Sequence, residues 1–118
     1  MKTLNGYGFS ITLKKCEVDI TDNKNELKKF LDDVVENVEM YKLGDAVFRT
    51  GSMHLPGISA IQVIETSHIA IHCFSKDISY MFNIESCKRF NVTKLKCFLV
   101  DYFNPKDFKI NAQYEVEV

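Results

Sequence analysis

The sequence lacks the features that mark several common classes of protein. It has no tryptophan, no Cys-x-x-C pair and no apolar run that approaches the length of a membrane span. Its formal net charge is −1, and its basic residues cluster only in pairs such as Lys14-Lys15, so we do not expect a nucleic acid partner. Residues 1–10 lack the continuous apolar core of a signal peptide. We therefore expect no membrane association and a cytoplasmic protein whose 4 cysteines are reduced.

What the sequence does contain fits one folded domain. Its 118 residues are 46% hydrophobic and 26% charged, with nine phenylalanines, which is enough for a modest hydrophobic core. We find no internal repeat, linker or low-complexity segment. The chain is therefore expected to form a single domain over residues 1–118.

The spacing of apolar residues predicts an α+β fold. Helical spacing runs from an N-cap at Asn23 to a stop at Gly44, with Tyr41 on the apolar face, and again from Asn91 to Asn104. Because several strands are apolar on one side only, we expect a two-layer sandwich, a mostly antiparallel sheet with two helices on one face. Strands are predicted over residues 7–14, 45–52, 58–64, 68–74, 78–84 and 108–118.

The last predicted strand has the most regular pattern in the chain. From 108 to 118 every second residue is apolar, and the residues between them are polar. Since successive side chains of a strand point to opposite faces, we expect the apolar set, which ends at Val118, to share one face of the sheet.

Ser67 is the first residue that suggests chemistry, because it lies where the chain reverses between two apolar strands. A serine at such a position is often only a turn residue. His72 follows five residues later, and if it reached back to Ser67 the two would form a nucleophile and its base. No carboxylate clearly orients the histidine and there is no G-x-S-x-G motif, so a serine hydrolase is weakly supported.

Two further groups have both an ordinary and a functional interpretation. His68 and His72 are four residues apart in a predicted strand and face the same side, which would suit two metal ligands, with Cys87 as the third. That spacing matches no zinc signature, and we expect no metal. Cys87 precedes the basic pair Lys88-Arg89, so it is either a reactive thiol or a small apolar side chain of the core.

Together these residues resemble the prokaryotic S-adenosylmethionine decarboxylases, whose signature reads Glu-Ser-His-x-x-Ile-His-Thr-Trp-Pro-Glu. Ser59, Ser67, His72 and Cys87 match that family in residue type and in spacing. The resemblance covers most of the chain, and on it we identify the protein as a divergent member of the family. The segments that carry it are Ile58-Ser59, Glu65-Thr66-Ser67-His68-Ile69-Ala70-Ile71-His72 and Ser86-Cys87.

The resemblance implies that the protein cleaves itself. The Ser67 hydroxyl would attack the carbonyl of Thr66 and convert the peptide bond to an ester. Ser59 would help to hold that intermediate, and His72 would remove the proton from the α-carbon of Ser67, so that the ester is eliminated. Hydrolysis would then leave a pyruvoyl group at position 67, with the two resulting chains still folded together.

The same resemblance implies the reaction. The pyruvoyl cofactor derived from Ser67 would form a Schiff base with a small-molecule amine substrate and accept electrons as carbon dioxide leaves. Cys87 would return a proton to the carbanion. The family works as a homodimer or larger homo-oligomer, with its site at or near the subunit interface, and it supplies spermidine synthesis.

The chain departs from the family pattern at Thr66 and over Cys73-Phe74-Ser75-Lys76, where the family has Thr-Trp-Pro-Glu. Thr66 stands where the family has glutamate, with Glu65 one residue earlier. Lys76 stands where the family has a glutamate expected to bind the ribose hydroxyls of the substrate, and an ammonium can only donate hydrogen bonds. We predict substrate contacts at Lys76 and Glu65. Lys76 leaves open a pyruvoyl decarboxylase of another amino acid, such as arginine or ornithine; Thr66 leaves open an unprocessed homologue that acts as a binding or regulatory partner.

Overall fold

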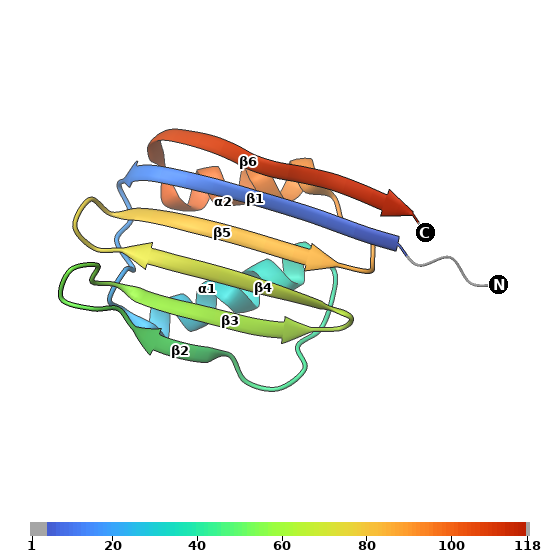
Figure 1. Cartoon of the computed structure of the whole chain (residues 1–118), viewed down its shortest axis with the longest axis horizontal. Helices are drawn as coiled ribbons and strands as arrows, with labels where there is room; N and C mark the ends of the chain where they lie inside the picture. The colour runs from blue at the N-terminus through green and yellow to red at the C-terminus, as the bar shows by residue number, and fades with distance from the viewer. Residues whose placement is uncertain (1–4, 118) are drawn as a thin grey trace.

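The computed structural model describes residues 5–117 and has two layers, a six-stranded sheet and two helices on one of its faces (Figure 1). The strands lie in the order β2-β3-β4-β5-β1-β6, and all neighbouring strands are antiparallel. The predicted α+β sandwich is confirmed. Neither described helix is long and apolar enough to cross a membrane. The elements are β1 (Asn5–Cys16), α1 (Lys24–Asn37), β2 (Val47–Thr50), β3 (Ile58–Ile64), β4 (Ser67–Phe74), β5 (Ser79–Ser86), α2 (Val92–Phe103) and β6 (Pro105–Glu117).

The hydrophobic core lies between the sheet and the helices. Alternate residues of β1, β4 and β5 point into it, and the apolar stripes of α1 and α2 cover them. Phe30 of α1 packs against Phe82 of β5 and Phe103 of α2, at ring-centroid distances of 6.4 and 5.0 Å. In the part of the chain that the structure describes, no helix covers the other face of the sheet, which we call the open face (Figure 1).

The first helix begins where the sequence predicts and ends earlier. The Asn23 side chain caps it by accepting a hydrogen bond of 3.1 Å from the backbone N–H of Glu26. The predicted stop at Gly44 is wrong, because the chain leaves the helix at Glu39, whose φ is +60°. The backbone N–H groups after the helix bond back to it in the Schellman pattern. That pattern usually uses glycine, so Glu39 gave no signal. Tyr41, predicted on the helix face, is 60% exposed.

A β-bulge changes the sides of β6. The register between β1 and β6 shifts by one residue at Asn111, which has no partner on β1. Phe108 therefore lies on the helix face, whereas Tyr114 lies on the open face, over Gly8. The prediction that all apolar residues of this strand share one face is wrong, and Val118 lies outside the described residues.

Candidate active site

The predicted catalytic residues lie at opposite ends of β4. Ser67 is the first residue of β4 and Cys87 follows β5 directly, so these two lie at one end. His72 is five residues further along β4, which at about 3.3 Å per residue places it about 16 Å from Ser67. The prediction that His72 reaches Ser67 within one chain is therefore wrong. A β-strand is too extended for a residue to reach back over five positions.

The peptide bond before Ser67 is strained and polarised. Thr66 has φ +49°, in the left-handed region that β-branched residues rarely adopt. Its carbonyl oxygen accepts a hydrogen bond of 3.1 Å from the backbone N–H of Cys87. A donor on this oxygen stabilises the negative charge that develops when a nucleophile attacks the carbonyl carbon. The backbone at Thr66 is thus suited to attack on its carbonyl.

Ser86 holds the hydroxyl of Ser67. The two serines are opposite each other on β4 and β5, and the Ser67 hydroxyl donates to Ser86 Oγ at 2.5 Å. Ser86 is buried, and its own hydroxyl donates to the carbonyl of Lys88 at 2.7 Å and accepts from the N–H of Lys88 at 2.8 Å. Sequence reasoning assigned no role to Ser86, since only the strand register shows that it faces Ser67.

A cavity of about 410 Å³ opens beside this pair, and both Ser67 and Cys87 line it, together with Tyr114 from the distant strand β6. Cys87 is exposed, so its interpretation as a core side chain is wrong. The buried cysteines are Cys16 and Cys73. The thiol of Cys87 is therefore accessible from the space next to Ser67.

Ser59 and His72 form the second group, at the opposite end of β4 and on the open face, whereas the Ser67 side chain shares the helix face with Ser86. They are opposite each other on β3 and β4, and Ser59 Oγ lies 2.8 Å from His72 Nδ1. If Nδ1–H donates to Ser59, the exposed ring keeps Nε2 as a free base. Ser59 can thus orient the imidazole for proton transfer. Ser67 of the same chain is too far away to be the group that exchanges this proton.

His68 and Glu65 lie at the Ser67 end of β4, and His68 lines the same cavity as Ser67 and Cys87. His68 and His72 are four residues apart on one strand, about 13 Å at the rise of a β-strand, so they cannot share a metal ion. Among residues 5–117 no group of three or more metal-ligating side chains occurs. Glu65 forms an ion pair of 3.2 Å with Lys88, and its role as a substrate contact stays a prediction.

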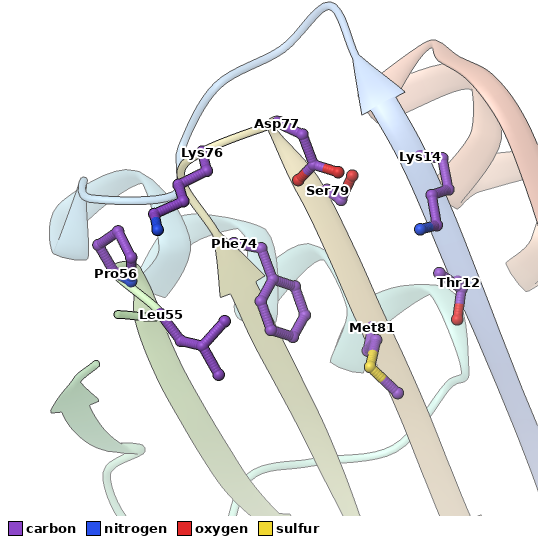
Figure 2. A pocket seen from close by; sticks show the side chains of 9 residues that line it. All are labelled: Thr12, Lys14, Leu55, Pro56, Phe74, Lys76, Asp77, Ser79 and Met81. Atoms are coloured by element: carbon purple, nitrogen blue, oxygen red, sulfur yellow. The ribbon is translucent and has the colours of Figure 1, made fainter. Parts of the chain in front are cut away.

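Lys76 lies in the turn between β4 and β5 and lines a second cavity, of about 470 Å³ (Figure 2). Met81 also lines it and is the cross-strand partner of His72, so this cavity adjoins the Ser59–His72 pair on the open face. We call it the lysine cavity. Its lining residues are Thr12, Lys14, Leu55, Pro56, Phe74, Lys76, Asp77, Ser79 and Met81.

Comparison with known proteins gives a consistent result. A sequence model of S-adenosylmethionine decarboxylase matches residues 9–114. The fold is similar to that in a crystal structure of the adenosylmethionine decarboxylase from Aquifex aeolicus VF5, with a TM-score of 0.72. That match has 16% sequence identity and covers 100% of this chain and 91% of the other. No curated protein matches the sequence significantly.

Proposed function

The chain belongs to the S-adenosylmethionine decarboxylase family, and from this we propose that it cleaves itself between Thr66 and Ser67 and works as a pyruvoyl-dependent decarboxylase. Its substrate would be S-adenosylmethionine and its product would supply spermidine synthesis. The observation that carries the proposal is the backbone at Thr66, which combines a left-handed φ of +49° with a hydrogen bond from Cys87 to the carbonyl oxygen.

The residues at this end fit the formation of a pyruvoyl group from Ser67. Attack of Ser67 Oγ on the Thr66 carbonyl carbon breaks the C–N bond and forms an ester, and the N–H of Cys87 stabilises the oxyanion. Removal of the α-proton of Ser67 then expels the Thr66 carboxylate and leaves a dehydroalanine at position 67, which water converts to the pyruvoyl group with loss of ammonia. The group at position 67 supplies an electron sink for loss of carbon dioxide. The Cys87 thiol lines the same cavity and would return a proton to the carbanion that forms as carbon dioxide leaves.

The base for the elimination must come from a second copy of the chain, because His72 of the same chain is about 16 Å from Ser67. We propose a homodimer in which two open faces pack together, as two sheets do at a spacing of about 10 Å. A two-fold axis that crosses β4 near Ala70, midway between Ser67 and His72, would place the Ser59–His72 pair of each copy over Ser67 of the other.

The character of the open face supports this dimer. The face carries apolar side chains that are 42–51% exposed in the single chain. Exposed apolar side chains gathered on one face are typical of an interface. The side chains come from four strands, β2, β3, β5 and β6, which include both edges of the sheet (Figure 1). They are Val47, Ile61, Val63, Met81, Tyr114 and Val116.

The test is an intact mass spectrum of the denatured, freshly purified protein. Two polypeptides, residues 1–66 and residues 67–118, with the second lacking a free amino terminus, are expected. The Ser67→Ala variant should give one mass. One intact mass for the unmodified protein after long incubation would contradict the proposal. That result would favour an unprocessed homologue that acts as a binding or regulatory partner.

A second substrate class is favoured by Lys76, whose ammonium lines the lysine cavity. Here the cleaved protein would decarboxylate another amino acid, such as arginine or ornithine. An ammonium near the substrate repels the sulfonium of S-adenosylmethionine and cannot accept hydrogen bonds from ribose hydroxyls. Comparing carbon dioxide release from the three compounds distinguishes the two substrate classes.

A further inference from the structure

The lysine cavity has a chemical character of its own. Figure 2 shows the ring of Phe74 standing between the side chains of Lys14 and Lys76, with the carboxylate of Asp77 near the rim. Leu55 adds an apolar wall. The cavity therefore combines an apolar floor with two cationic groups and one anionic group.

Neither lysine of this cavity takes part in an ion pair among residues 5–117. Lys14 comes from the end of β1, whereas Lys76 comes from the turn after β4. Their ammonium groups remain available to a ligand, and they outnumber the carboxylate of Asp77. The net positive charge favours a ligand that carries at least one carboxylate.

The volume and the walls restrict the rest of the ligand. A cavity of about 470 Å³ is within the range of small-molecule sites. The apolar side chains of Leu55, Phe74 and Met81 suit a short aliphatic chain. Besides Asp77, the side-chain acceptors that line the cavity are the hydroxyls of Thr12 and Ser79, and each already accepts a hydrogen bond within the protein. Asp77 is thus the main acceptor there for the hydroxyl groups of a ribose.

We propose that the lysine cavity binds a short aliphatic amino acid through a carboxylate held by Lys76. This deepens the second substrate class, an amino acid in place of S-adenosylmethionine, and rests on the proposed decarboxylase, because the cavity adjoins the Ser59–His72 pair that faces the second copy in the proposed dimer. The far end of the ligand is either a second carboxylate, which Lys14 meets, or an ammonium, which Asp77 meets.

The test is calorimetric titration of the Ser67→Ala variant, which cannot form a pyruvoyl group or react with an amine. L-glutamate and L-ornithine are the probes, compared with adenosine and with 1,4-diaminobutane, which is ornithine without its carboxylate. We expect one of the two amino acids to bind. If that ligand is ornithine, 1,4-diaminobutane should bind at least about tenfold more weakly than ornithine.

Second-site variants in this background identify the contacts. Lys76→Met should weaken binding by about tenfold or more, whereas Lys28→Met, on the exposed side of α1, should leave it unchanged. Loss of binding in Lys14→Met identifies a second carboxylate, and loss in Asp77→Asn identifies an ammonium. Unchanged binding in Lys76→Met, adenosine as the only ligand, or no binding of either amino acid would overturn the inference.

Failure of the proposed function gives a different result from failure of this inference. The titration needs no cleavage, so binding of an amino acid by the Ser67→Ala variant supports the inference even if the unmodified protein stays intact. If the unmodified protein is cleaved and releases carbon dioxide from S-adenosylmethionine with the same kcat/KM in Lys76→Met, the function stands and the inference is wrong.

Discussion

The separation of Ser67 from His72 makes a strong prediction about how cleavage is shared between two chains. Each residue is on β4, five positions apart, so about 16 Å separates them in any single copy. If the base comes from a partner, a chain with Ser67→Ala supplies an intact His72, and a chain with His72→Ala supplies an intact Ser67. Each variant alone should stay uncut, and a mixed dimer should have one complete site.

The expected magnitude follows from random assortment. When the two variants are coexpressed in equal amounts, about half of all chains enter mixed dimers. Up to about half of the His72→Ala chains should therefore be cleaved after residue 66, and none of the Ser67→Ala chains. An affinity tag on one variant separates the two species in an intact mass spectrum, which reports the cleaved fraction of each.

Two controls make this experiment decisive. Coexpression of His72→Ala with a double variant, Ser67→Ala and His72→Ala, should give no cleavage, because no chain then supplies the histidine. When His72→Ala is coexpressed with Ser59→Ala, few of the His72→Ala chains should be cleaved. Ser59 and His72 act as one pair, and neither variant keeps both residues. Cleavage of His72→Ala alone, or its complete absence in the first mixture when the unmodified protein is cleaved, would refute the reasoning.

Two further predictions concern stability. Tyr80→Phe should lower the free energy of unfolding by about 1–3 kcal/mol. The buried hydroxyl donates to the carbonyl of Val18 at 2.8 Å and accepts from the N–H of Ile20 at 2.9 Å, and both backbone groups would lose their partner. Urea titration should show this loss, and little change for the exposed Tyr41→Phe. Burial raises the pKa of the Cys73 thiol from 9.0 to about 12, so the unfolded chain ionises first and the free energy of unfolding should fall as pH rises from about 9 to 12. Urea titrations across that range should show a smaller fall in the free energy of unfolding for Cys73→Ala, since Cys16, with its pKa raised to about 11, still contributes. The exposed Cys97→Ala is the control and should show the same fall as the unmodified protein. A fall of the same size in Cys73→Ala would contradict this account.

Local patterns in the sequence predicted most of the secondary structure. The strand over Ile58–Ile64 matches β3, and Asn91 caps α2, because alternating apolar residues and N-cap side chains act over a few neighbouring positions. The errors arose at two positions that local patterns do not mark. Glu39 closes a Schellman motif without glycine, and Asn111 forms a bulge that reverses the sides of β6.

By itself, the sequence determined the elements, the two-layer fold and the four residues that match the decarboxylase family, because spacing and residue type are local properties of a chain. Only the tertiary structure decided how those residues are grouped. Pairing of β3, β4 and β5 put Ser59 against His72 and Ser67 against Ser86, about 16 Å apart along the strand. Residues near in sequence are held apart by an extended strand, and residues far apart are joined by strand pairing, so the division of the site into two ends could not be read from the order of the residues.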